Sequence, residues 1–233
     1  MENTQYAWTK EAGSTHLVEI VSHILTTIGY GQLGTGKTED SYFPTMIKKM
    51  TEVITSVSAG GDHSLISTKM GNVYAAGRND QGQLGTGDRR STTVFTLLKD
   101  MDHISVIKVE AGHQHSACIS SNRELYIWGT ECFGEFLIPH LVKTIKGRWH
   151  QVWLGKNFGS VLTDKGDVYV WGNNGWGQLG VGDKKSRPTP TRISSIKNKT
   201  ITSISWGNVF TLALGETIYF NRSKSSNKRS SSK

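Results

Sequence analysis

Two segments of the chain have the glycine spacing of a phosphate-binding turn. The strings GYGQLG from Gly29 and GWGQLG from Gly175 fit the pattern GxGxxG, in which glycines let the backbone approach a dinucleotide pyrophosphate. In a dinucleotide-binding domain that pattern follows a strand and opens a helix, and it occurs once. Here the GQLG part recurs along the chain and is followed by polar loop sequence. We therefore interpret these glycines as structural turns, and the sequence predicts no cofactor.

Three histidines are the right residue type for a metal site. His16, His63 and His115 each stand three residues after the glycine of an Ala-Gly pair. Phe158 and Phe210 occupy the same slot in two other copies of that motif, and a phenylalanine cannot bind a metal. The slot is therefore predicted to be a buried packing position, with the histidines hydrogen-bonded and structural.

Other repeated polar and aromatic positions also have structural interpretations. Trp128 and Trp171 align with Ala76, which favours core positions over stacking platforms. Asp88 and Asp183 follow GTG and GVG at equivalent points, where an aspartate side chain typically accepts a hydrogen bond from the backbone two residues on. The sequence thus predicts no catalytic constellation, and at most an activity that works by binding.

These positions belong to three repeat series that run in phase. The GQLG string begins at Gly31, Gly82 and Gly177, and a degraded copy, FGEF, runs from Phe133 to Phe136. A second series begins at Ala12, Ala59, Ala111, Leu154 and Trp206, with AGGDHSLIST and AGHQHSACIS as its clearest members. A third series consists of VYAAG at Val73, LYIWG at Leu125 and VYVWG at Val168. A period of about fifty residues indicates a repeat architecture.

Each repeat reads as four strands. Two short β-branched runs surround a glycine-containing turn, a hairpin turn such as KMGN or DKGD follows, and an alternating strand such as VYVWG ends at glycine. A long polar loop then leads to a last short strand, which in the fourth repeat is expected near Thr191 to Ile193. The predicted fold class is all-β: a β-propeller of four-stranded antiparallel blades.

The GQLGTGD loops, the AGxxHS turns and the YxWG strands, over roughly residues 12 to 215, resemble the repeats of the regulator of chromosome condensation family. That resemblance implies a propeller, seven-bladed in the family, and a namesake that is the guanine nucleotide exchange factor for the small GTPase Ran. Other relatives are scaffolds or sensor domains. Fold membership does not determine which of these roles applies.

The chain is short for that family. We expect a propeller of about four to five blades over residues 1–220 and a disordered, basic Ser/Lys-rich tail over 221–233. The propeller is therefore incomplete or shortened, and three explanations stay open: a compact closed ring of about five blades, a ring completed by a partner or by self-association, or a shortened variant of a longer protein.

Charge and composition exclude some classes of protein. The net charge of +8 is concentrated in the tail, where Arg222, Lys224, Lys228, Arg229 and Lys233 lie, so weak contact of the tail with nucleic acid or another acidic surface stays open. The chain has no apolar stretch long enough to span a membrane and no secretory signal, and we expect an intracellular protein of the cytoplasm or nucleus. Cys118 and Cys132 are expected to be reduced thiols.

Function is expected where the repeats differ. The least repeat-like stretch, from Thr130 to Trp153, replaces the glycine-rich loop with apolar residues and predicts an apolar contact loop, with packing at a blade edge as the alternative. Two other loops carry paired basic residues, which predict a basic rim on one face. The candidate partner-binding residues are Arg89, Arg90, Phe133, Phe136, Leu137, Ile138, Lys184 and Lys185.

Three partner hypotheses follow. The first is a protein-interaction propeller that regulates a small GTPase, for example by guanine nucleotide exchange. The second is a non-catalytic scaffold subunit of a cytoskeletal, ciliary or chromatin assembly. The third is nucleic-acid association through the basic tail, which a steep salt dependence of binding would reveal.

Overall fold

A computed structural model describes residues 5–8, 19–22, 29–43, 45–47, 50–131, 134–143, 147–196, 199–206 and 211–217. Within these ranges the chain forms β-strands joined by turns and loops, and the one helical element is a short 3-10 turn, Lys99–Met101. The predicted all-β class is confirmed. His16, Cys132, Phe133, Phe210 and the tail from residue 221 lie outside the described ranges.

Three complete sheets each contain four antiparallel strands in chain order. The first consists of β4 (Ile54–Ala59), β5 (His63–Thr68), β6 (Val73–Gly77) and β7 (Thr92–Leu97); the second of β8 (Val106–Ala111), β9 (His115–Ser120), β10 (Leu125–Glu131) and β11 (Gly134–Leu141); and the third of β12 (Trp149–Leu154), β13 (Phe158–Thr163), β14 (Val168–Gly172) and β15 (Arg187–Arg192). These are the predicted four-stranded blades.

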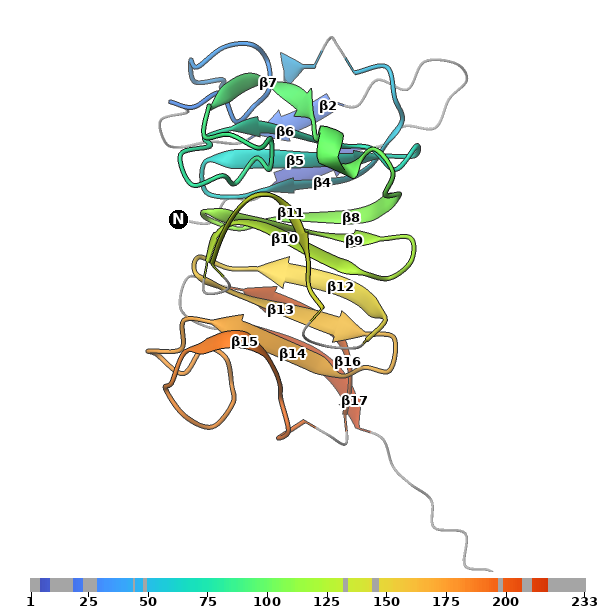
Figure 1. The fold of residues 1–233 in the computed structure, drawn as a ribbon, viewed down its shortest axis with the longest axis vertical. Helices are drawn as coiled ribbons and strands as arrows, with labels where there is room; N and C mark the ends of the chain where they lie inside the picture. Colours follow the sequence, from blue (N-terminus) through green and yellow to red (C-terminus); the bar gives the residue numbers. More distant parts are fainter. Residues whose placement is uncertain are drawn as a thin grey trace, which may run out of the picture.

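Two partial sheets precede and follow them. The first has three strands, β1 (Gln5–Trp8), β2 (Glu19–Ser22) and β3 (Thr45–Met46), and the last has two, β16 (Lys199–Trp206) and β17 (Thr211–Thr217). Figure 1 shows the three complete sheets stacked in chain order along the long axis, with β16 and β17 beside the β12–β15 sheet at one end. The assembly is an incomplete propeller.

The tight hairpins inside each sheet form where the sequence predicts them. Gly71 and Gly166 turn the chain with φ of 88° and 80°, between β5 and β6 and between β13 and β14. Arg123 takes the equivalent place between β9 and β10 with φ of 65°. All three residues donate a backbone hydrogen bond to the carbonyl three residues before them, which closes the same turn.

The core lies between neighbouring sheets. One apolar cluster, including Leu65, Leu84 and Trp128, joins the β4–β7 sheet to the β8–β11 sheet. A second, including Trp149 and Trp171, joins β8–β11 to β12–β15, and a third joins β12–β15 to β16. Trp128 and Trp171 are fully buried, which confirms that their slot is a core position.

One sequence-based expectation about strands was wrong, and one expected strand begins earlier than predicted. Residues 134–141 form β11 and not a loop: β10 continues to Glu131, and the pairs Thr130–Glu135 and Glu131–Gly134 extend the ladder. The degraded copy FGEF keeps one glycine, Gly134, in place of the two in GQLG, and the residues after it continue as an extended strand. The last strand of the third complete sheet begins at Arg187, before the expected Thr191, since a strand at the edge of a sheet tolerates prolines 188 and 190.

Candidate partner-binding surface

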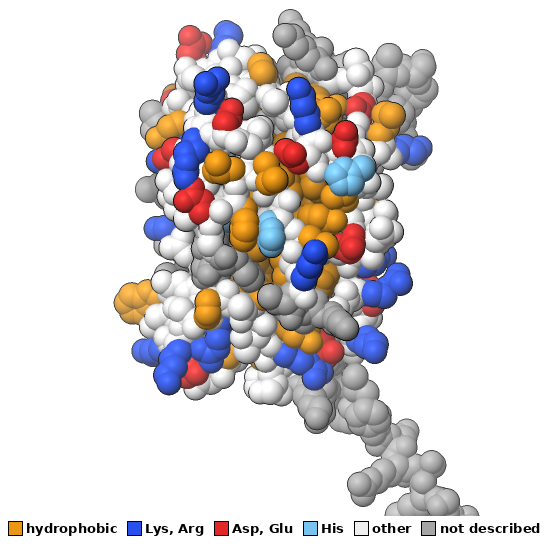
Figure 2. Space-filling view, in the orientation of Figure 1, with side chains coloured by type: hydrophobic (Ala, Val, Ile, Leu, Met, Phe, Trp, Pro, Cys, Tyr) orange, Lys and Arg blue, Asp and Glu red, His pale blue; other side chains and the backbone are white. Residues whose placement is uncertain are grey.

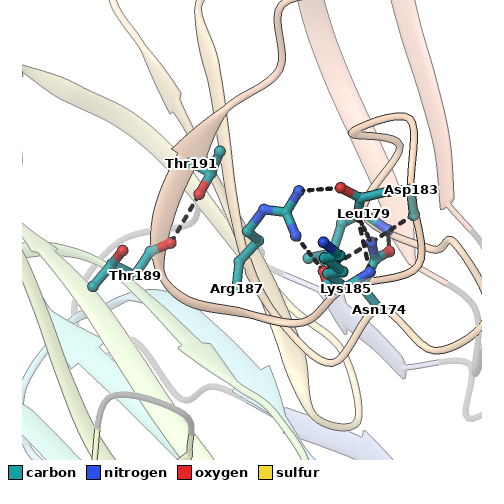
Figure 3. Close-up of polar contacts among 7 residues, drawn as sticks. All are labelled: Asn174, Leu179, Asp183, Lys185, Arg187, Thr189 and Thr191. Carbon is teal, nitrogen blue, oxygen red and sulfur yellow. Dashed lines mark hydrogen bonds and ion pairs between the residues drawn. The ribbon is translucent and has the colours of Figure 1, made fainter.

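The long loops between β6 and β7 and between β14 and β15 share one internal frame. The side chain of Asn79 is buried: its Nδ2 donates to the carbonyls of Asp88 (2.9 Å) and Arg90 (3.2 Å), and its Oδ1 accepts from the Leu84 amide (2.9 Å). Asn174 makes the same three bonds, to Asp183 and Lys185 and from Leu179 (Figure 3). One asparagine therefore fixes each loop.

These asparagines were missed by the sequence analysis. Their signal was present, because NDQGQLG and NGWGQLG place an asparagine three residues before the GQLG string in both loops. An asparagine amide can both donate to carbonyls and accept from an amide, so it can organise a loop that has no regular backbone hydrogen bonding.

The two aspartates act as predicted. Asp88 Oδ1 accepts from the Arg90 amide at 3.0 Å, and Asp183 Oδ1 accepts from the Lys185 amide at 2.9 Å. Arg187 also bonds to the Asp183 carboxylate at 2.8 Å, and this contact lowers the pKa of Asp183 (Figure 3). The Asx-type turns are confirmed, and they hold the paired basic residues at fixed positions.

The recurring glycines allow the loops of residues 29–41 and 78–91 to pack closely against the next sheet. Gly36 donates its amide to the carbonyl of Thr93 in β7 (2.8 Å), and Gly87 donates to that of Leu137 in β11 (2.9 Å). A Cβ on Gly82 would lie 2.7 Å from the Leu137 side chain, and the backbone there has φ of 75°. The loops lead into strands and not helices, so their interpretation as structural turns is confirmed.

The histidine slot is a packing position, as predicted. His63 and His115 are only 1% and 3% exposed, and Phe158 in the same slot is equally buried. His63 Nε2 lies 2.7 Å from Ser116 Oγ, which itself donates to the Gln83 carbonyl at 2.7 Å. His63 therefore donates from Nε2 and is neutral; burial, with His113 nearby, lowers its pKa to about 3.

The basic residues of these loops differ in their contacts. Arg89 forms an ion pair with Glu135 of β11 and bonds to the Asp80 carbonyl, so it ties its loop to the next sheet. Arg90, Lys184 and Lys185 are exposed, and no acidic side chain of the described residues pairs with them. Figure 1 shows both loops on the same side of the stack, and Figure 2 shows Lys and Arg side chains gathered over the β14–β15 end.

The apolar candidates are mostly packed. Phe136 is half-buried between the first and second core clusters and stacks on His140 with ring centroids 4.2 Å apart. Leu137 lies against Gly82, whereas Ile138 is 44% exposed. The packing alternative thus describes Phe136 and Leu137, and a partner-binding role for Ile138 stays a prediction.

Three findings bear on the expectations about the cysteines, membrane spanning and metal binding. Cys118 is a buried free thiol, and burial raises its pKa. Among the described residues, no helix has the length and apolar character needed to cross a membrane. No group of three metal-binding side chains comes together in this same part of the chain.

Comparison with curated proteins shows relatives that are similar to this chain over part of their own length. The chain is 31% identical over 207 residues to the human E3 ubiquitin-protein ligase HERC2, covering 82% of this chain and 4% of that protein. It is 31% identical over 195 residues to the Arabidopsis thaliana ultraviolet-B receptor UVR8, covering 79% of this chain and 44% of the receptor. The chain thus spans less than half the length of either relative.

Solved structures and family models agree on the architecture. Prp20p from Saccharomyces cerevisiae superposes with a TM-score of 0.76 at 19% identity, over 88% of this chain and 53% of Prp20p. Human WBSCR16 gives 0.71 at 23% identity, over 86% and 56%. The family model for the regulator of chromosome condensation (RCC1) repeat matches residues 29–67, 70–119 and 165–214, and a second model of that description matches 54–83. This chain belongs to the regulator of chromosome condensation (RCC1) repeat family.

Proposed function

We propose that this chain is a protein-interaction propeller that binds an acidic surface of a regulatory partner through the loops at one edge of its sheets. The carrying observation is the placement of Arg90, Lys184 and Lys185 on loops that are each fixed by a buried asparagine. Cations on a fixed backbone steer a partner by charge, and the loop backbone need not become ordered when the partner binds.

A small GTPase of the Ran type is the finer candidate for this partner. In its support, the solved structure of Prp20p is described with the binding of that protein to Gsp1p and histones, and Prp20p has the same fold. Nucleotide exchange requires no acid, base or nucleophile. It needs only tighter binding to the nucleotide-free form of the GTPase than to the loaded form.

A scaffold in a cytoskeletal, ciliary or chromatin assembly is the second candidate. It is favoured by the exposed apolar side chains near the end of the stack, since Trp176, Leu212 and Leu214 are each more than three-fifths exposed. Apolar groups that face water at an incomplete architecture are typical of surfaces that another chain covers.

The test measures association of the full chain with Ran-like GTPases that carry a fluorescent nucleotide. A variant with Arg90→Glu, Lys184→Glu and Lys185→Glu should associate about tenfold more slowly at low salt, and the difference should shrink as salt rises. The matched control reverses Lys69, Lys99 and Lys143, which are exposed on other surfaces.

Three outcomes distinguish the candidates. Accelerated nucleotide release, lost with the loop variant alone, supports the exchange function. Salt-dependent binding without release supports a scaffold. Equal losses in both variants would show that net charge acts and that these loops are not the binding surface.

A further inference from the structure

The loop between β14 and β15 has the backbone shape of the loop between β6 and β7, but no described residue of another sheet packs against its glycines. Its glycines 177, 180 and 182 have φ of 81°, 65° and 90°, close to the 75°, 74° and 83° of Gly82, Gly85 and Gly87. In the earlier loop, a Cβ on those glycines would meet Leu137, Trp128 and Ile138 of the next sheet. In the later loop, a Cβ on any of the three would meet no atom of the described residues within 4 Å.

Hydrogen bonding shows the same difference. The Gln83 carbonyl accepts from Ser116 Oγ (2.7 Å) and from the Trp128 indole (2.8 Å). The equivalent Gln178 carbonyl accepts from Thr211 Oγ1 at 2.7 Å, and no indole of the described residues reaches it. Strand β17 therefore contacts this loop as β9 contacts the earlier one, and among the described strands none supplies the counterpart of Trp128.

The loop amide that bonds to the fourth strand in the earlier copy has no partner among the described residues in the later one. Gly87 donates to the Leu137 carbonyl of β11, whereas no carbonyl in the described part of the chain accepts from the equivalent amide of Gly182. On the adjoining sheet, β17 pairs with β16 alone among the described strands, and its Leu212 and Leu214 are 66% and 69% exposed. An unpaired strand edge readily pairs with a strand from another chain.

We propose that this end of the molecule binds a β-hairpin of a partner protein, whose first strand pairs with β17 and whose second strand lies on the loop of residues 173–186. The loop between β6 and β7, which the next sheet covers, shows why a hairpin with two strands is needed. Trp128 of β10 and Leu137 of β11 both contact the earlier loop, and these two strands form one hairpin.

The loop between β6 and β7 also defines the chemistry of the occupant. Its first strand should carry a tryptophan that donates to the Gln178 carbonyl, as Trp128 does to Gln83. Its second strand should carry an acidic residue two positions before an apolar one, as Glu135 precedes Leu137. Arg89 pairs with Glu135, and Lys184 is the equivalent of Arg89 in the later loop, so Lys184 would pair with that acid.

The test uses the full chain and a labelled peptide of its own residues 124–142, with Cys132→Ser, as a probe that has the required pattern. Gly180→Asn is the blocking variant, since asparagine tolerates a φ of 65° and no described neighbour lies within 4 Å of a Cβ there. The asparagine side chain would fill the position of the indole. Lys69→Glu, in the distant β5–β6 turn, is the charge control for Lys184→Glu.

We expect saturable binding, measured by fluorescence anisotropy, that Gly180→Asn weakens by about tenfold or more. Lys184→Glu should weaken binding by about threefold, and Lys69→Glu should leave it unchanged. A peptide with Trp128→Ala should bind about tenfold more weakly than the parent peptide. Near-ultraviolet circular dichroism of Gly180→Asn should match that of the parent, so that a loss of binding reports this loop and not the fold.

Several outcomes would overturn the proposal: no saturable binding, binding that Gly180→Asn leaves intact, or a concentration-dependent dimer that Gly180→Asn dissociates while the peptide stays unbound. The dimer would identify a second copy as the occupant. Arg90→Glu separates this site from the proposed function, because it should slow association with an acidic partner and leave peptide binding unchanged.

Discussion

Individual buried residues of the repeats have protonation states that differ between the folded and the unfolded chain. Burial keeps His63 neutral and lowers the pKa of His63 to about 3; the pKa of His115 is lowered likewise. Burial raises the pKa of Glu110, on β8, to about 7, against the lowering influence of Lys108. Each shift makes the free energy of unfolding depend on pH.

For the histidine slot we expect His63→Phe to make the free energy of unfolding depend less on pH under acidic conditions. Below about pH 6.5 the unfolded parent binds a proton at His63 that the folded protein does not bind until about pH 3, so parent stability falls across that window. Phenylalanine, which fills the slot at position 158, cannot bind that proton. Urea unfolding at several pH values measures the slope. An identical slope in parent and variant would mean that His63 is protonated in the folded state.

For Glu110 the expected sign is opposite. The folded state keeps its proton up to about pH 7, whereas the unfolded state loses it near 4.5, so this group reduces stability as pH rises between those values. The free energy of unfolding of Glu110→Gln, minus that of the parent, should therefore be more favourable to folding at pH 8 than at pH 4. Chemical denaturation at both values tests this, and an equal difference at both would show that Glu110 ionises normally.

At the scale of elements, the sequence predicted the strands better than the loops. Alternating apolar residues and hairpin glycines gave the four-stranded blades, because those patterns depend on local backbone geometry. The frame around Asn79 and Asn174 was not predicted, since it joins residues up to eleven positions apart. The contact loop predicted within residues 130–153 is instead the strand β11, because the repeat does not continue where its glycines are missing.

Loop stability should depend on these two asparagines. Asn79→Ala leaves the buried Leu84 amide and two carbonyls without partners, and we expect it to cost about 2 to 3 kcal/mol in the free energy of unfolding. Asn174→Ala should behave alike, whereas Asn173→Ala, at an exposed neighbour, should cost much less. Denaturant titration compares the three. Equal costs would show that the buried bonds do not support the loops.

Packing between sheets should depend on the buried tryptophans. Trp171 lies in the cluster that joins β8–β11 to β12–β15, and a Cβ on Gly159 would lie 2.5 Å from its ring. Trp171→Ala should cost about 3 to 5 kcal/mol through lost burial and a new cavity. An unchanged midpoint in chemical denaturation would show that the indole does not hold the sheets together.

At the scale of the whole molecule, the loops of residues 29–41 and 78–91 each pack against the following sheet, whereas the second complete sheet has the strand β11 in place of such a loop. The equivalent loop of residues 173–186 has no such sheet against its glycines among the described residues. The basic residues Lys184 and Lys185 and the exposed Trp176 lie on that last loop. Partner binding is therefore expected at this loop, and the buried positions that the repeats share maintain the frame.

The amide exchange rates of Gly87 and Gly182 test this account most directly. In the free chain, the Gly87 amide, bonded to the Leu137 carbonyl, should exchange about a hundredfold or more slowly than the Gly182 amide, and added hairpin peptide should slow Gly182 alone. Residue-resolved hydrogen exchange by nuclear magnetic resonance makes the comparison. Equal protection of both amides in the free monomer would contradict the account, because it would show that the last loop is already occupied.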